Sequence, residues 1–372
     1  CCVSLVTGAL VAMAWALKRF SLTKNVPLAI SRGTTASVVR LELTVERGGI
    51  CGRGETGGFE TGHRSYDTES VEQELQTLLP RLNTLDSLLP QRLEPLLQAL
   101  SPPARCAVDL ACWDWWGQHL GQPLWNLWGL DGQRQVATSV TLGLGGVEAV
   151  LERLNRWWSQ LPATRIKLKL GSPDGLDHDR SLVEAVASAV EDRRQSTGAS
   201  VELQVDANGG WSLDEALSML QTLDRFGVVL LEQPLAPDAD PQRDLKGFAA
   251  LHSHCPMPLV ADESCWNLGD LLRLAPAVDG VNLKLLKTGG LSSALLMARV
   301  AGELGLDLMV GCYSDSALLN GAAAQLLPLM RWPDLDSHLN LVDDPYCGLP
   351  LEDDRLRPSS DPGLGIRPRE RR

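Results

Sequence analysis

Six ionisable side chains sit at regular positions in short apolar segments and could together perform metal-assisted acid–base chemistry. They are three acids and three lysines: Asp206, Glu232, Asp262, Lys167, Lys169 and Lys284. None of the acids has a histidine or cysteine directly beside it. An oxygen-only ligand set of this kind suits a hard cation, so we expect Mg²⁺.

The segment 165–170 places two of the lysines on one face. Its sequence alternates, so that Ile166, Leu168 and Leu170 share one side of a strand while Lys167 and Lys169 share the other. An edge strand with a solvated lysine face is the alternative. If the apolar side instead packs on helices, both lysines point inward and need carboxylates or a ligand.

The acids follow the same parity on later segments. Asp206 ends the polar face of 201–206, Glu232 is in phase with Leu230, and Asp262 is in phase with Val260. Lys284 and Asn282 repeat the pattern on the next segment. A buried ion-pair network is the alternative to a metal site, but three acids in succession favour the metal.

Elements that could hold these residues recur along the second part of the chain. Strand-like segments lie near eight positions, separated by helical stretches: 137, 166, 202, 229, 259, 281, 307 and 334. This series predicts a (β/α)₈-type TIM barrel, an α/β fold whose active site lies at the C-terminal ends of the strands.

The first part of the chain has a different pattern. Residues 13–57 predict antiparallel strands with a turn at Gly48-Gly49, residues 52–62 a mobile glycine-rich loop, and residues 71–128 helices interrupted by prolines. We expect an α+β capping domain at 13–135, completed by 343–372, and a barrel at 136–342. Residues 1–12 are expected to be a loose extension.

Composition restricts the partners. The net charge of -12 argues against nucleic acid, because phosphates would be repelled. Nine cysteines without C-x-x-C spacing fit free thiols in a reducing cytoplasm. Lys18 and Arg19 follow the uncharged N-terminal run, which is the wrong order for a secretory signal, and we expect no membrane role. A homo-oligomer is the expected assembly.

These motifs resemble the enolase superfamily, in particular its muconate-lactonising-enzyme-like subgroup. The matching stretches are Lys167-Leu168-Lys169, Asp206-Ala207-Asn208, Glu232-Gln233-Pro234, Asp262-Glu263-Ser264 and the run from Asn282 to Gly290. Strand seven has no histidine between Leu308 and Ser314, which argues against the mandelate-racemase-like branch.

The resemblance implies a division of roles in proton abstraction beside a carboxylate. Asp206, Glu232 and Asp262 would bind Mg²⁺, and Lys169 and Lys284 would act as acid and base on opposite faces of the substrate. Lys167 would support Lys169. Glu263 and Asn208 would hold the metal ligands in position without binding the ion themselves.

Asp334 and Asp336 narrow the reaction. They share a face near the last strand, so we expect both to project into the mouth of the site. They look like the Asp-x-Asp pair of dipeptide epimerases, which binds the substrate's ammonium group. A loop-capping role for the pair is the alternative. We therefore expect epimerisation of an L,L-dipeptide such as L-Ala-L-Glu. Muconate cycloisomerase, o-succinylbenzoate synthase or N-succinylamino acid racemase activity, and a non-catalytic binding barrel, remain open.

Arg32 is the candidate for the substrate's side chain. It lies on the loop that overhangs the substrate in this family and could hold a carboxylate in a bidentate manner, which would favour glutamate as the second residue. An ordinary surface arginine is the alternative. Arg53, in the glycine-rich segment, is a rival for the same role.

Overall fold

The N-terminal part of the chain is built on a three-stranded antiparallel sheet. The computed structural model describes residues 13–30 and 33–370, so the expectations for residues 1–12 and for Arg32 lie outside the described residues. The strands are β1 (Met13–Ile30), β2 (Gly33–Arg47) and β3 (Ile50–Thr56), in the order β1-β2-β3. Gly48 and Gly49 join β2 to β3 with positive φ angles, as the predicted turn requires.

Four helices follow, and the breaks between them lie at prolines, as predicted. They are α1 (Thr68–Leu82), α2 (Pro90–Leu97), α3 (Pro102–Leu120) and α4 (Leu124–Leu127). The prediction of a mobile loop at 52–62 was wrong in its first half. Gly52 and Gly54 belong to β3, where α3 packs so closely that a Cβ atom would collide with the helix backbone. A short hairpin, β4 (Phe59–Glu60) and β5 (Ser65–Tyr66), lies between β3 and α1 in the chain.

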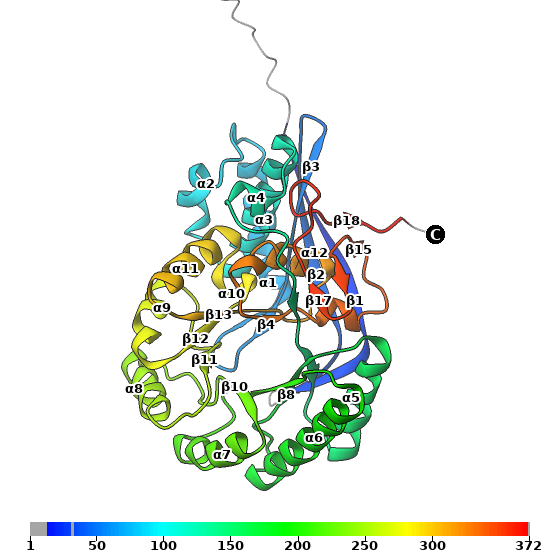
Figure 1. Cartoon of the computed structure of the whole chain (residues 1–372). Coiled ribbons are helices and arrows are strands. Elements are labelled where there is room, and N and C mark those ends of the chain that lie inside the picture. Colours follow the sequence, from blue (N-terminus) through cyan, green and yellow to red (C-terminus); the bar gives the residue numbers. More distant parts are fainter. Residues whose placement is uncertain (1–12, 31–32, 371–372) are drawn as a thin grey trace, which may run out of the picture.

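Eight parallel strands form the barrel, and each pairs with the next along the chain (Figure 1). They are β7 (Val140–Leu142), β8 (Arg165–Lys169), β9 (Glu202–Asp206), β10 (Val228–Glu232), β11 (Leu259–Ala261), β12 (Gly280–Leu283), β13 (Asp307–Gly311) and β14 (Trp332–Asp334). Ser139 N donates to the Pro333 carbonyl at 3.0 Å, which brings the first and eighth strands together. The predicted TIM barrel is confirmed.

The position of the first barrel strand was predicted a few residues too early. Val136–Ala137 is a separate strand, β6, which pairs with Leu356 and Arg355 outside the barrel. The barrel begins only at Val140. Both segments are short and apolar, so the pattern of residues could not separate them.

Helices surround the barrel (Figure 1). They are α5 (Val147–Gln160), α6 (Leu176–Thr197), α7 (Leu213–Arg225), α8 (Pro241–His252), α9 (Leu268–Leu274), α10 (Leu285–Thr288), α11 (Leu291–Glu303) and α12 (Ala317–Ala324). Apolar strand residues such as Ile166 and Leu168 are fully buried against them. A small apolar cluster, Leu230, Val260, Met309 and Trp332, has the opposite parity and forms a layer of its own, separate from the main core.

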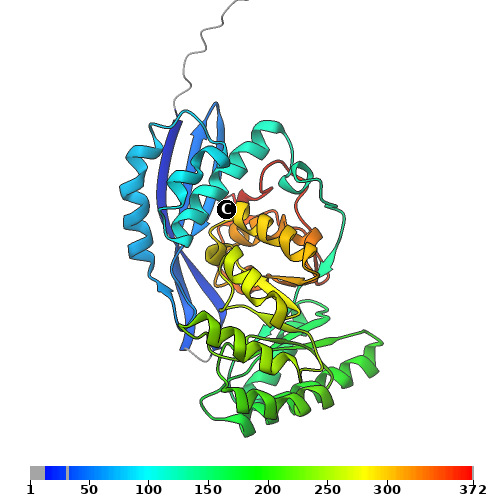
Figure 2. The same ribbon diagram turned by 90° about the vertical axis from the view of Figure 1, so that its left-hand side faces the viewer.

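The C-terminal segment returns to the N-terminal helices, as expected. Leu364 N donates to Asp114 Oδ1 at 2.9 Å, and Gly363 lies against Gly117 of α3. The strands of this segment are β15 (Tyr346–Cys347), β16 (Leu351–Glu352), β17 (Arg355–Leu356) and β18 (Arg367–Pro368). The exact domain boundaries stay predictions. Figure 2 shows β1 and β2 running down beside the barrel, so that their far end lies next to its mouth.

Two further features concern the surface and the thiols. Within the described ranges, no helix is both long and apolar enough to cross a membrane. The seven cysteines of these ranges are free thiols.

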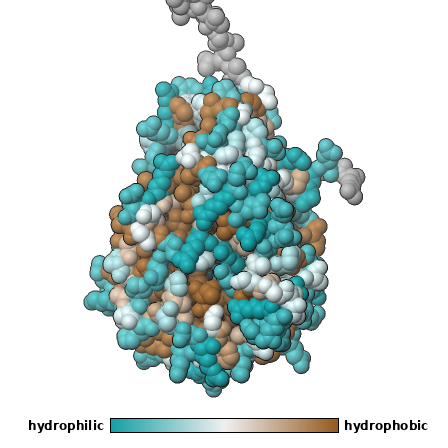
Figure 3. All heavy atoms as spheres, viewed as in Figure 1, coloured by the Kyte–Doolittle hydropathy of each residue, from teal (hydrophilic) through white to brown (hydrophobic). Residues whose placement is uncertain are grey.

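On the face seen in Figure 3, hydrophilic residues cover most of the surface, and hydrophobic residues gather in patches near its middle.

Candidate active site

Lys167 and Lys169 point into the barrel from β8, as the alternation predicted. Lys169 Nζ lies 2.5 Å from Asp206 Oδ2. Lys167 Nζ lies 2.6 Å from Glu232 Oε2 and 3.1 Å from Asp206 Oδ2. Asp206 and Glu232 are themselves paired in register on β9 and β10. The edge-strand alternative is therefore wrong, because both lysines are buried among carboxylates.

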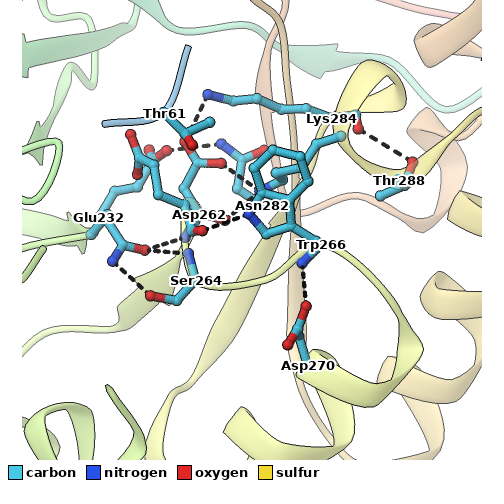
Figure 4. Close-up of polar contacts among 12 residues, drawn as sticks. Thr61, Glu232, Asp262, Ser264, Trp266, Asp270, Asn282, Lys284 and Thr288 are labelled. Atoms are coloured by element: carbon cyan, nitrogen blue, oxygen red, sulfur yellow. Dashed lines mark hydrogen bonds and ion pairs between the residues drawn. The ribbon is translucent and has the colours of Figure 1, made fainter. Parts of the chain in front are cut away.

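The third acid, Asp262, follows β11, and its two lysine partners come from the end of the neighbouring strand β12 and from α10. Lys284 Nζ lies 2.7 Å from Asp262 Oδ2 (Figure 4). Lys287 Nζ lies 2.6 Å from Asp262 Oδ1. Lys287 also donates to the Asn282 carbonyl at 3.0 Å. Sequence reasoning did not single out Lys287. The sequence feature that could have identified Lys287 is its spacing. It lies three residues after Lys284, and this is the spacing of side chains that are neighbours on a helix.

A framework of amides fixes the strand ends that carry these acids. Gln233 has a φ of 35°, and its Oε1 accepts from the backbone N–H of Asp262 at 2.9 Å. Its Nε2 donates to Ser264 Oγ at 3.0 Å. Asn208, with a φ of 47°, donates from Nδ2 to Glu263 Oε1 at 3.2 Å. Both residues hold backbone conformations that are rare outside glycine, which is typical of a constrained site.

Charge at the site is unevenly compensated. Burial opposes ionisation of Asp206 and Asp262, but the adjacent lysines outweigh it and hold the pKa of each below its ordinary value. Burial and the neighbouring Asp206 raise the pKa of Glu232 to about 7, although Lys167 opposes this shift. Burial would lower the pKa of Lys284, but Asp262 raises it well above its ordinary value.

These three acids have the composition of a Mg²⁺ site. The protein would supply only carboxylate oxygens, which are the ligands that Mg²⁺ prefers. Among residues 13–30 and 33–370, no cluster of histidine, cysteine or acidic side chains is already gathered as a preformed metal site. Lysine ammonium groups lie beside the acids instead, so the ion-pair network considered above describes the present contacts.

A cavity of roughly 290 Å³ opens above these residues. Lys169 and Lys284 both line it, together with Tyr313 and Phe59. The Tyr313 and Phe59 rings stack with centroids 4.5 Å apart, and Lys284 Nζ lies 4.6 Å from the centre of the Tyr313 ring. The N-terminal domain supplies the upper wall, mainly from the end of β1, the start of β2 and β4. The cavity is therefore built by both parts of the chain.

The two acids of the last strand are placed differently from the expectation. Asp334 does not project freely into the mouth: it accepts from Lys167 Nζ at 2.7 Å and from Ser139 Oγ at 2.6 Å. Asp336 accepts from the Thr141 backbone N–H at 2.7 Å. The strand ends at Asp334, so the alternation on which the expectation depended no longer applies at Asp336.

Arg53, the rival to Arg32, lies elsewhere. It is on β3, where its guanidinium contacts Glu42 Oε1 at 2.7 Å, and it does not line the cavity that contains the two lysines. It was a candidate only because residues 52–62 were predicted as a loop.

Comparison with known proteins gives the family. Residues 16–129 match the N-terminal domain of mandelate racemase / muconate lactonizing enzyme, and residues 149–372 match the enolase C-terminal domain-like family. The hydrophobic dipeptide epimerase of Roseobacter litoralis is 36% identical over 346 residues, which cover 92% of this chain and 96% of that protein. The L-Ala-D/L-Glu epimerase of Bacteroides thetaiotaomicron is 30% identical over 340 residues, which cover 90% and 82%.

A solved structure agrees in fold. The dipeptide epimerase from Enterococcus faecalis V583, complexed with Mg and the dipeptide L-Leu-L-Tyr, matches with a TM-score of 0.83 and 27% identity. The match covers 95% of this chain and 99% of that one. The chain belongs to the mandelate racemase / muconate lactonizing enzyme family of the enolase superfamily.

Proposed function

We propose that the protein is a Mg²⁺-dependent dipeptide epimerase, which moves a proton at the α-carbon of the C-terminal residue of an L,L-dipeptide. The observation that carries this proposal is the position of the two cavity-lining lysines. Lys169 is on the second barrel strand and Lys284 follows the sixth, so they approach the cavity from opposite sides. Epimerisation needs an acid and a base on opposite faces of one carbon, whereas an elimination could use one base.

In this proposal, one lysine removes the α-proton and the other returns a proton to the opposite face. Tyr313 supports Lys284 through its ring, and Lys167 fixes the carboxylates around Lys169. Asp206, Glu232 and Asp262 would hold Mg²⁺, which when bound supplies positive charge for the substrate carboxylate and for the negative charge that develops beside it.

The remaining residues would bind and orient the dipeptide. Asp336 and Asp334 supply negative charge near the eighth strand, where the substrate's ammonium group would lie. Glu263 and Asn208 hold the strand ends in place. Arg32 would contact the second side chain. The dipeptide epimerases among the relatives support a dipeptide as the substrate. The free thiols suit the cytoplasm, and a homo-oligomer is the assembly we expect.

The test is α-proton exchange in D₂O with Mg²⁺ and a panel of L,L-dipeptides that includes L-Ala-L-Glu and L-Ala-L-Leu. We expect deuterium to enter the second residue while its configuration scrambles. The panel should also contain N-succinylamino acids and muconate. Reaction with these alone would favour the alternative activities. If none of the compounds reacts although the protein is folded and Mg²⁺ stabilises it, the proposal fails in favour of a binding barrel.

A further inference from the structure

Lys24 lies at the end of β1 that reaches the cavity, and its backbone is tied to the chain just after the eighth strand. Val26 N donates to Asn340 Oδ1 at 3.1 Å, and Asn340 Nδ2 returns a bond to the Val26 carbonyl at 2.8 Å. Val342 N donates to the Thr23 carbonyl at 3.0 Å. Lys24 itself forms an antiparallel bridge with Leu341. These bonds fix Lys24 beside the segment that begins at Asp336.

The side chain of Lys24 lines the same cavity as the two lysines proposed for catalysis. The other lining cations have carboxylate partners: Lys169 pairs with Asp206, Lys284 with Asp262, and Arg40 with Asp315. Within the part of the chain that the structure describes, Lys24 has no ion pair and no side-chain hydrogen bond. A half-buried ammonium group without a partner is costly, so the site favours an anion.

The charges around Lys24 indicate where on the substrate that anion would be. Burial lowers the pKa of Lys24, and the largest opposing effect is that of the charge on Asp336. Asp336 is the residue proposed to meet the substrate's ammonium group. The three acids proposed for the metal, and hence the substrate's own carboxylate, belong to the third, fourth and fifth strands. Lys24 therefore lies on the side of the cavity where the N-terminal residue of the proposed substrate would be bound.

We infer that Lys24 binds the side-chain carboxylate of an acidic N-terminal residue, so that the substrate class is L-Glu-L-Xaa or L-Asp-L-Xaa. Asp336 and Lys24 together present one negative and one positive charge. An acidic N-terminal residue carries the matching ammonium and carboxylate groups. This inference rests on the proposed function.

A pair of isosteric substrates isolates the charge. L-Glu-L-Leu and L-Gln-L-Leu have almost the same shape, and only the first carries a negative charge on its first side chain. We expect kcat/KM for exchange to be at least about tenfold higher for L-Glu-L-Leu, because a charge-assisted contact is formed. In Lys24→Met this ratio should fall to about one. In Lys18→Met, which removes an exposed lysine of the same strand away from the cavity, the ratio should not change.

Three results would overturn the inference while leaving the proposed function intact. The first is a Glu-to-Gln ratio near one in the unaltered protein, with L-Ala-L-Leu exchanged normally. The second is a ratio that persists in Lys24→Met. The third is a Lys24-dependent preference for L-Ala-L-Glu over L-Ala-L-Gln, which would assign Lys24 to the second residue. Absence of exchange with every dipeptide would instead reject the proposed function.

Discussion

Lys167 Nζ lies 2.7 Å from Asp334 Oδ2, so a buried ion pair joins the second and eighth strands of the barrel. Asp334 is therefore already engaged, and also accepts from Ser139 Oγ. Asp336 has no lysine partner of this kind and accepts hydrogen bonds from Thr141, through its backbone N–H at 2.7 Å and through its side chain. The two acids form one sequence motif but have different surroundings. We therefore expect Asp336 to contribute mainly to substrate binding and Asp334 mainly to stability.

This difference predicts different defects for two matched variants. Asp336→Asn should raise the KM for a dipeptide by roughly 10- to 100-fold, because a charge-assisted contact to the ammonium group is lost. Asp334→Asn should lower the free energy of unfolding by about 1–3 kcal/mol, because the buried Lys167 loses one of its carboxylates. Steady-state kinetics and denaturant unfolding of both variants measure this. Equal effects of both substitutions on KM and stability would contradict it.

The lysines on opposite sides of the cavity predict stereospecific defects. Lys169→Ala and Lys284→Ala should each abolish epimerisation by at least about 10³-fold, since one proton transfer is missing. Each variant should exchange the α-proton of no more than one stereoisomer. The stereoisomer that is exchanged should differ between the two variants. Exchange of L,L- and L,D-dipeptides in D₂O, followed by NMR, reads this out. Exchange of both isomers by either variant would assign both transfers to one lysine.

Tyr313 should act through its ring and not through its hydroxyl group. Lys284 Nζ lies 4.6 Å from the ring centre, whereas the hydroxyl is buried without a hydrogen-bond partner in the described residues. Tyr313→Phe should keep kcat within about threefold. Tyr313→Leu should lower kcat by roughly 3- to 30-fold, the range of a cation–π contact. The Phe variant is the matched control, and an equal loss in both would place the effect on the hydroxyl.

The sequence predicted most of the barrel and the inward residues, because both depend on local periodicity. Alternation along 165–170 correctly placed Lys167 and Lys169 on one inward face, and the register of β9 with β10 places Asp206 beside Glu232. Apolar patterning is repeated in every strand, so an error in one segment does not affect the next.

Features that depend on contacts between distant segments were not predictable in the same way. The pairing of Asp334 with Lys167 depends on how the barrel closes, and the position of Lys24 depends on hydrogen bonds between β1 and residues 340–343. The glycines at 52 and 54 were interpreted as a loop because their role, the close approach of α3, is visible only in three dimensions.

Mg²⁺ should stabilise the protein, and the effect should depend on the three acids. At a Mg²⁺ concentration of about 100 times Kd, the free energy of unfolding should rise by roughly 2–3 kcal/mol. Glu232→Gln should remove most of this gain, because an amide is a weaker ligand than a carboxylate. Thermal unfolding with MgCl₂ and with EDTA measures the gain. A gain that persists undiminished in Glu232→Gln would place the ion elsewhere.

Glu55 should make stability depend on pH. It lies on β3, is fully buried, and accepts from the backbone N–H groups of Ser316 and Leu319 at the start of α12. Burial raises the pKa of Glu55 to about 8; the nearby Asp315 adds to this shift, and Arg40 opposes it. We therefore expect the folded protein to keep a proton that the unfolded chain releases near its ordinary pKa of 4.5.

The sign of the effect follows from that difference in proton binding. As pH rises from about 4.5 to 8, the unfolded chain ionises first, so the contribution of Glu55 to stability falls, by on the order of 2–4 kcal/mol. Glu55→Gln cannot ionise and should lack this component. The free energies of unfolding of both proteins should therefore be similar near pH 5. As pH approaches 8.5, the variant should become more stable relative to the unaltered protein. Parallel pH profiles for the two proteins would show that Glu55 is already ionised in the folded state, with Arg40 outweighing its burial.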